Sequence, residues 1–350
     1  MTIASPILMW YDSRMLSRPP TIKDIAAHLG LDPSSVSRAL NGHGGVSEET
    51  RELIKRTADE LGYVINISAR MMQQKQSKLV GLLVPDIKND FHSTMAAILA
   101  EHCRGLSFQM VLSNTDDDPE VEESQVRALI EARAAGIVIT ATPNPTAKTV
   151  QYLRTVPTVQ LLRHVSGIKG DVVCMEDAAG IGAAVEHLLS LGHRRIAYVG
   201  TRDDISVGAE RLRGFTETHR RAALKPDKAL IVLGQPRQSF ASDGVERILR
   251  RRNPPTALIV GSTEMTVGAL QAVTRLNLSI PGDLSFVGYG NPEWYSLLSP
   301  PLTTVNLPVE NMARSAVAKL FRRINRDVSS RTDKDNMQAE LVIRASTAMV

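Results

Sequence analysis

Residues 21–42, TIKDIAAHLGLDPSSVSRALNG, decide how the start of this 350-residue chain folds. Ile22, Ile25, Ala26 and Leu29 recur at the spacing that places them on one face of a first helix. Gly30 follows directly and permits the tight turn that ends this helix. The stretch therefore predicts two short helices joined by a turn.

The second helix of this stretch is predicted to begin at Pro33, because a helix start leaves unpaired the N–H that proline lacks. Val36, Ala39 and Leu40 give this helix a buried side. Its remaining side chains face outwards, namely Pro33, Ser34, Ser35, Ser37 and Arg38. A short polar helix held in this way is typical of the recognition helix of a helix-turn-helix, which reads the DNA major groove.

A third helix is predicted after Ser47, which serves as its N-cap and precedes two glutamates in the positively polarised first turn. Residues 50–61 repeat at helical spacing, and Leu53 falls in this pattern, so we expect it on the shared core of the three helices. Gly62 can end the helix in a left-handed conformation. The three helices would bury one small common core.

The motifs TIKDIAAHLG, SSVSRALNG, VSEETRELI and ADELGY together resemble the DNA-binding headpiece of the lactose-repressor/galactose-repressor (LacI/GalR) family of bacterial transcription regulators. The resemblance runs from about Pro20 to the C-terminus. It implies a regulator that binds double-stranded operator DNA as a homodimer, and we expect this regulator to be a repressor. We expect the DNA contacts at Thr21, Lys23, Pro33, Ser34, Ser35, Ser37, Arg38, Asn41, Ala69 and Met72.

Residues 65–77 are short and polar, and such a segment is only marginally stable as an isolated helix. The resemblance implies a hinge helix that forms when two subunits meet on the operator, with Met72 at the position that wedges into the minor groove. The sequence departs from the family at Ile65, where proline is usual, and at Ser68, where an apolar residue is usual. The alternative is a plain linker in which Met71 and Met72 pack on the core.

From residue 79 the pattern changes to short apolar runs that alternate with amphipathic stretches, which predicts strands and helices in parallel sheets. The strands are too many for one ordinary sheet. We therefore expect an α/β core of two lobes of doubly wound parallel sheets, which resembles the periplasmic-binding-protein-like core of the same family. The predicted division is a disordered tail at 1–18, the helix-turn-helix domain at 19–64, the hinge at 65–77 and the core at 78–350, with lobes at about 79–174 and 175–304 and with 305–350 crossing back to both.

The resemblance places a small-molecule effector between the two lobes, and Phe91, Arg211 and Ser262 match positions that contact it. Three positions that usually carry polar groups for sugar hydroxyls differ, since Leu162, Ser262-Thr263 and Gly290 stand there. With Arg211 retained and acceptors removed, we expect an anionic effector such as a sugar acid or a phosphorylated metabolite. The alternative is a cleft that binds nothing physiologically.

The composition fits a DNA-binding protein, because the net charge is +4 and residues 14–78 hold ten Lys and Arg against seven Asp and Glu. Neither a signal peptide nor a membrane span is evident in the sequence, so we expect a cytoplasmic protein. Cys103 and Cys174 are too far apart in the chain to suggest a disulfide framework or a zinc site. The chain ends soon after a strand-like segment at 341–343 and lacks a terminal leucine heptad, which favours dimers over tetramers.

Catalytic patterns are not found: the sequence contains neither a Gly-rich phosphate loop nor the GxSxG and HExxH motifs. The run Asp116-Asp117-Asp118 precedes Pro119 and an acid-rich helix start, so it is interpreted as capping and loop charge rather than a metal site. We therefore predict no enzyme activity, no metal and no cofactor. The competing classes are a solute-binding receptor, which would need a secretion signal and no headpiece, and an enzyme on a doubly wound fold.

Overall fold

The computed structural model describes residues 18–41, 44–63, 77–325 and 332–350. The chain divides into two compact units, residues 1–75 and residues 76–350. Each unit has an apolar core of its own. The predicted hinge, with its expected DNA contacts Ala69 and Met72, lies outside the described residues, as do residues 1–17.

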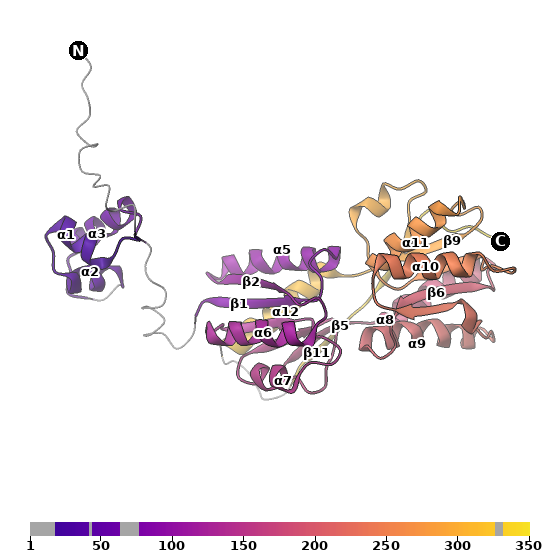
Figure 1. Cartoon of the computed structure of the whole chain (residues 1–350), viewed down its shortest axis with the longest axis horizontal. Helices are drawn as coiled ribbons and strands as arrows, with labels where there is room; N and C mark the ends of the chain where they lie inside the picture. Colours follow the sequence, from indigo (N-terminus) through magenta and orange to yellow (C-terminus); the bar gives the residue numbers. More distant parts are fainter. Residues whose placement is uncertain (1–17, 42–43, 64–76, 326–331) are drawn as a thin grey trace, which may run out of the picture. The chain divides into compact units, whose positions relative to one another are not determined.

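The first unit contains three helices, α1 (Ile22–Leu29), α2 (Pro33–Leu40) and α3 (Glu48–Glu60) (Figure 1). Gly30 has a φ of 65° and ends α1, a conformation that costs glycine little. The Asp32 carboxylate accepts a hydrogen bond from the Ser34 amide at 2.8 Å and caps α2, whose first residue is Pro33. The Ser47 hydroxyl accepts from the Thr50 amide at 3.2 Å and caps α3. Local capping chemistry thus fixes where these helices begin.

The core of this unit is apolar and is shared by all three helices. Its buried members are Ile25, Ala26, Val36, Ala39, Ile54 and Ala58. The expectation for Leu53 is wrong, because 48% of its surface is exposed. α3 turns Ile54, Thr57 and Ala58 inwards, so the preceding residue Leu53 lies about a quarter turn away from the core.

The second unit contains two six-stranded sheets, which define lobe 1 (residues 77–175, 309–325 and 332–337) and lobe 2 (residues 177–306 and 340–350). The order in lobe 1 is β11-β5-β4-β3-β1-β2, and all neighbours are parallel. Its strands are β1 (Leu79–Val84), β2 (Gln109–Asn114), β3 (Gly136–Ile139), β4 (Thr158–Leu161), β5 (Asp171–Met175) and β11 (Lys334–Met337).

Lobe 2 repeats this architecture in the order β12-β10-β9-β8-β6-β7, and only β12 is antiparallel to its neighbour. Its strands are β6 (Ile196–Thr201), β7 (Ile231–Gly234), β8 (Ala257–Val260), β9 (Ser285–Tyr289), β10 (Thr303–Asn306) and β12 (Glu340–Val342). The predicted fold class, two α/β lobes with doubly wound parallel sheets behind a helical headpiece, is confirmed.

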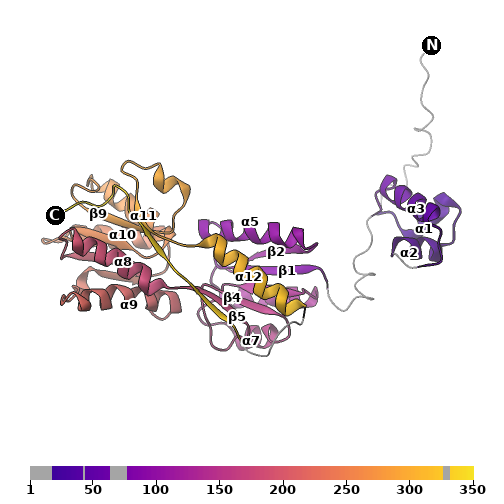
Figure 2. The same ribbon diagram turned by 180° about the vertical axis from the view of Figure 1, so that it is seen from behind.

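Helices cover both faces of each sheet, as parallel strands require. In lobe 1, α5 and α12 pack together on one face while α6 and α7 cover the other (Figures 1 and 2). In lobe 2, α8 and α9 share one face and α10 and α11 the other. The helices are α5 (Asp90–Gly105), α6 (Pro119–Glu131), α7 (Ala147–Leu153), α8 (Asp177–Ser190), α9 (Ser206–Arg221), α10 (Gln238–Leu249), α11 (Thr263–Arg275) and α12 (Val309–Ile324), with the short 3₁₀ helices η3 (Lys228–Leu230) and η4 (Glu293–Ser296).

The chain passes between the lobes three times, after β5, after β10 and between β11 and β12. The helix expected at 309–325 lies in lobe 1 as α12, and the strand expected at 339–343 lies in lobe 2 as β12. The edge strand β11 was not expected. Its sequence, KDNM, lacks the apolar run that marks a buried strand. Such a run is not required here, because the strand lies at the edge of the sheet, pairs only with β5 and has half of its residues exposed.

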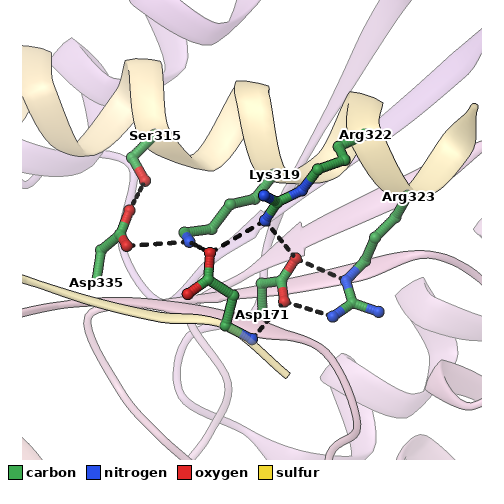
Figure 3. Close-up of polar contacts among 7 residues, drawn as sticks. Asp171, Ser315, Lys319, Arg322, Arg323 and Asp335 are labelled. Carbon is green, nitrogen blue, oxygen red and sulfur yellow. Dashed lines mark hydrogen bonds and ion pairs between the residues drawn. The ribbon is translucent and has the colours of Figure 1, made fainter. Parts of the chain in front are cut away.

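A network of ion pairs fastens the returning chain to lobe 1 (Figure 3). The Asp171 carboxylate, with 1% of its side chain exposed, accepts hydrogen bonds from the Arg323 guanidinium and from the Asp333 amide. Lys319 contacts the Asp333 carboxylate at 2.5 Å and the Asp335 carboxylate at 3.0 Å. Although burial raises the pKa of Asp171, these hydrogen bonds hold it below its usual value. The network thus joins α12, β5 and the start of β11.

Replacing Arg323 by methionine should lower the free energy of unfolding of the core by about 3 kcal/mol, because the Asp171 carboxylate would remain buried without its main partner. Denaturant unfolding followed by circular dichroism measures this loss. The matched control on the same helix is Arg314→Met, which removes an exposed ion pair with Glu310 and should cost less than about 1 kcal/mol. Equal losses in the two variants would contradict the structural role given to the network.

The C-terminal tail is held against lobe 2 by a buried histidine. Nε2 of His193 lies 3.0 Å from the Ala348 carbonyl oxygen, and Nδ1 lies 2.8 Å from the Thr256 hydroxyl. Since a carbonyl only accepts, Nε2 carries the proton of the neutral ring. The Ser346 hydroxyl adds a bond to the Phe286 carbonyl at 2.6 Å and accepts one from the Thr303 amide.

Burial lowers the pKa of His193, and burial together with His193 lowers the pKa of His187. When the pKa of a histidine is lower in the folded protein than in the unfolded chain, where it is near 6.5, acid favours unfolding. The stability present at a pH above about 6.5 is therefore lost as the pH falls below this value. The free energy of unfolding should therefore fall between pH 7 and pH 5. For the variant His193→Gln, which retains a hydrogen-bond donor, the free energy of unfolding should fall less steeply over the same pH range. A variant with the same slope as the parent protein would show that His193 is not responsible.

Candidate functional site

The exposed face of α2 brings together most of the expected DNA contacts. Pro33, Ser34 and Arg38 are exposed, while Ser35, Ser37 and the following Asn41 are half-buried. Thr21 and Lys23 are exposed at the start of α1. The buried residues of α2, Val36 and Ala39, pack on the headpiece core and fix this orientation.

The Arg38 guanidinium lies along α2 rather than in an ion pair. Its Nη2 donates to the Ser34 hydroxyl at 3.1 Å and its Nε donates to the Ser34 carbonyl at 3.3 Å. The Asn41 amide similarly donates to the Ser37 carbonyl at 2.9 Å. The Arg38 bonds are exposed and the Asn41 bond is partly buried, and both side chains could exchange them for contacts to base edges.

A cavity of about 400 Å³ lies between the lobes, lined by segments that follow the carboxyl ends of strands in both sheets. Parallel sheets place their ligand sites at these ends. Lobe 1 contributes Pro85, Asp86, Asn89, Phe91, His92, Asp116, Asp117, Thr140, Leu162 and Arg163, and lobe 2 contributes Thr201, Val207, Arg211, Gln235, Pro236, Arg237, Ser262, Thr263, Glu264 and Tyr289, with Leu307 from the second crossover. We call this cavity the interlobe pocket.

All three residues expected to contact an effector line the interlobe pocket. Phe91 lies in the first turn of α5 and packs edge-on against His92, with ring centroids 5.3 Å apart. Ser262 is the N-cap of α11, and its hydroxyl already accepts a hydrogen bond from the Met265 amide. The structure thus brings together residues 171 positions apart in the chain.

Arg211 is buried, and its charge is already neutralised within lobe 2. Its Nε donates to the Asp177 carboxylate at 2.5 Å, and its Nη1 donates to the Gly261 carbonyl at 2.8 Å. The guanidinium carbon also lies 4.1 Å from the centre of the Tyr289 ring, whose hydroxyl donates to Asp177 at 2.6 Å. Arg211 therefore forms part of the pocket floor rather than a free cation.

The pocket has oxygen acceptors that the sequence interpretation missed. Asp86, Asn89 and Asp116 come from loops after β1 and β2, and Gln235 follows β7. Asp117 is bound through both carboxylate oxygens by Arg163, which also donates to the Ala141 carbonyl at 3.1 Å. Their position directly after predicted strands is a signal that could have found them. The interpretation as capping and loop charge concerns only the run 116–118, and no prediction was made for Asp86, Asn89 or Gln235.

Several buried polar atoms of the pocket have no hydrogen-bond partner among the described residues. They are Nδ1 of His92 and the hydroxyls of Thr140 and Thr201. Burial, together with the charge of Arg163, lowers the pKa of His92 to about 3, so its ring is neutral. Unpaired polar atoms in a buried site are costly unless a ligand satisfies them.

The backbone is strained at the same place. Asp116, Asp117 and Leu162 have φ values of 54°, 58° and 62°, in the left-handed region that residues with a side chain rarely adopt. All three line the pocket. Strain held at a ligand cavity is a common feature of binding sites, because the surrounding fold must fix the loops that contact the ligand.

Neither a metal site nor a membrane span is found in the part of the chain that the structure describes. No group of three or more His, Cys, Asp and Glu residues is arranged to hold an ion there. No helix in the same ranges is long and apolar enough to cross a membrane. Asp118 caps α6 by accepting from the amides of Glu120 and Val121, as predicted for this acidic run.

A helix-turn-helix headpiece followed by a two-lobed core with a pocket between its lobes defines a DNA-binding regulator with a ligand-binding core. Residues 21–66 match the family described as bacterial regulatory proteins, lacI family, and residues 185–347 match the periplasmic binding protein-like domain. The chain is 31% identical to the HTH-type transcriptional regulator DegA of Bacillus subtilis, over 94% of this chain and 98% of that protein. The chain belongs to the lacI family of bacterial regulatory proteins.

Two further similarities agree with this assignment. The chain is 29% identical to the ribose operon repressor of Escherichia coli, over 87% of this chain and 93% of that protein. Its fold matches the Lac repressor dimer bound to operator and the anti-inducer ONPF, with a TM-score of 0.81 and 25% identity over 95% and 100% of the two chains. The protein is a DNA-binding transcriptional repressor with an effector-binding core, and its family consists of regulators rather than enzymes.

Replacing Arg38 by alanine should weaken binding to the preferred DNA sequence by about 1–3 kcal/mol and relax the preference at one base pair per half-site, because a guanidinium can contact the O6 and N7 atoms of guanine. Selection from a random DNA pool, followed by titration, measures both effects. Lys55→Ala is the control, since Lys55 is exposed on α3 and pairs with Glu52. An Arg38→Ala variant as selective as the parent protein would disprove the assignment of α2 as the recognition helix.

Proposed function

We propose that two copies of this chain bind a near-palindromic operator in the cytoplasm, with one α2 helix in each major-groove half-site. The observation that carries this proposal is the exposed polar face of α2, which is held outwards by Val36 and Ala39. Pro33, Ser34 and Arg38 would discriminate bases, while Ser35, Ser37 and Asn41 would add base or phosphate contacts. Thr21 and Lys23, at the start of α1, would meet the phosphate backbone.

Residues 66–76 would form hinge helices when the two subunits meet on the operator, with Ala69 and Met72 in the minor groove. An effector in the interlobe pocket would change the relation of the two lobes. The effector would shift the equilibrium between a core that allows the hinge helices to form and one that does not. It can do so only through its different affinities for these two states, and such a coupling is typically about 1–3 kcal/mol. Occupancy of the pocket would thus decide whether the hinge pair can form.

The dimer contact is proposed on the face that holds α5, the edge strand β2, η4 and α11. Large apolar side chains are exposed on this face, namely Leu106, Leu112, Trp294 and Leu297. Trp294 and Leu297 border a hollow that also includes Asp90 and Thr94 of α5, so this face runs across both lobes. Several large apolar side chains exposed on one face are typical of a subunit contact.

The effector is proposed to be a neutral polyhydroxylated molecule of the sugar class. The unpartnered hydroxyls of Thr140 and Thr201 and the acceptors Asp86, Asn89 and Asp116 suit sugar hydroxyls, which both donate and accept. Phe91 lines the same pocket and would pack against an apolar ring surface of the ligand. The transcriptional regulator CelR has a solved structure as a cellobiose complex, to which this chain is similar with a TM-score of 0.69 and 26% identity over 93% of this chain and 99% of that one.

The expected anionic effector is less well supported, because both arginines at the pocket floor and wall are already paired. Asp177 neutralises Arg211 and Asp117 neutralises Arg163. The missing acceptors on which that expectation depended are supplied by other loops. Arg237 is the cation of the pocket lining whose side chain makes no hydrogen bond or ion pair to a described residue, and it is exposed.

The effector class is tested by titrating the full chain with neutral sugars, sugar acids and sugar phosphates, followed by thermal unfolding. A ligand at one hundred times its Kd should add about 2.7 kcal/mol to the free energy of unfolding. Neutral sugars should stabilise the parent protein, and Thr140→Val should bind them about tenfold or more weakly, since one buried hydroxyl contact is worth about 1–3 kcal/mol. Asp243→Asn, an exposed change on α10, is the control. Stabilisation by the acids and phosphates alone would overturn the neutral class.

A further inference from the structure

Basic side chains gather on lobe 2 at the amino ends of the strands, on the side of the sheet away from the interlobe pocket. Arg195 precedes β6, Lys225 and Lys228 precede β7, and a run of three arginines, 250–252, precedes β8. We call these six residues the end patch. Since the carboxyl ends of both sheets face the pocket, the amino ends of the lobe 2 strands, which carry the end patch, and the amino end of β1 lie at opposite ends of the core.

Arg195 brings the two loops of the end patch side by side. Its Nη1 lies 3.0 Å from the Asp227 carboxylate, and its Nε donates to the Asn253 carbonyl at 2.9 Å. Asp227 is the acid within the patch, and its pKa is lowered by the Ala229 amide first and also by Arg195 and Arg251. Arg250 pairs with Glu246 of α10. Among the six residues of the end patch, only Arg195 and Arg250 are thus paired with a carboxylate of the described residues.

The charged side chains of four of these residues make no ion pair or hydrogen bond with a described residue. They are Lys225, Lys228, Arg251 and Arg252, and all are exposed. The usual structural reason for basic residues here would be the negative end of a helix, but that effect is limited to the last turn. α9 ends at Arg221, so Lys225 and Lys228 lie beyond its last turn. The end of α10 at Leu249 can account only for Arg251 and Arg252, which follow it closely. The mutual repulsion of the four side chains favours a bound polyanion.

We propose that the end patch is a second DNA-binding surface, which holds the phosphate backbone of another duplex segment while the headpieces occupy the operator. This rests on the DNA-binding function of the headpiece. Residues 225–228 and 250–253, KPDK and RRRN, contain no aromatic or aliphatic anchor of the kind that protein interfaces use at their centre, whereas unpaired Lys and Arg are what phosphates require. Binding would be independent of base sequence and would bring two DNA segments together.

The test uses the full chain with its headpieces saturated by excess immobilised operator, chosen by selection from a random pool. A labelled duplex of unrelated sequence is then added, and its capture is measured at rising salt. The parent protein should capture the duplex at about 50 mM salt and lose it steeply as salt rises. The triple variant Lys228→Gln/Arg251→Gln/Arg252→Gln should reduce the slope of log affinity against log salt by about 3, because each phosphate contact contributes about 0.9.

The matched control removes three positive charges from exposed positions of lobe 1, as Arg127→Gln/Lys148→Gln/Arg314→Gln, and should capture the duplex as the parent does. Capture by the end-patch variant equal to the parent, or no capture by the parent at low salt, would overturn the proposal. So would capture of labelled polyglutamate without capture of the duplex, which would indicate an acidic protein instead. Loss of operator binding in the parent would disprove the headpiece function, which is a separate result.

Discussion

A parallel strand can follow another only after a crossover that carries the chain back along a helix, and this constraint organises the whole core. Within lobe 1 all strands therefore run in the same direction, and within lobe 2 all strands except β12 do so. With the two sets of carboxyl ends facing each other, the loops that follow the strands meet in one cavity. The amino ends of the two sheets are left at opposite ends of the core. The interlobe pocket and the end patch are thus the two products of one topological rule.

The same arrangement decides the electrostatics of the pocket. Arg211 and Arg163 come from different lobes, and each is neutralised by a carboxylate of its own lobe, Asp177 and Asp117. A buried arginine requires such a partner because an uncompensated charge in this environment is costly. The pocket is left with hydroxyls and neutral His92 as its unsatisfied groups. A ligand with many hydroxyls meets these groups without bringing a net charge that must be compensated.

Passing three times between the lobes leaves the last segments of the chain far from their sequence neighbours, and polar interactions fasten them there. The Asp171 network joins α12 and β11 to lobe 1, and His193 with Ser346 fixes the tail to lobe 2. Both attachments lie at the amino ends of the sheets, away from the pocket. In the proposed regulation, a ligand would change the relation of the lobes while these attachments stay intact.

The sequence by itself determined the headpiece helices, the alternation of strands and helices, and the membership of Phe91, Arg211 and Ser262 in one site, because caps, periodicity and family motifs are local signals. Tertiary structure alone decided that Arg211 is paired with Asp177, 34 residues away, that Leu53 is exposed, and that KDNM forms an edge strand. The tertiary structure also revealed the end patch. The net charge of the core residues is close to zero and gives no sign that basic side chains gather at one place. These features depend on which distant segments are brought into contact, and neither charge counts nor periodicity contain that information.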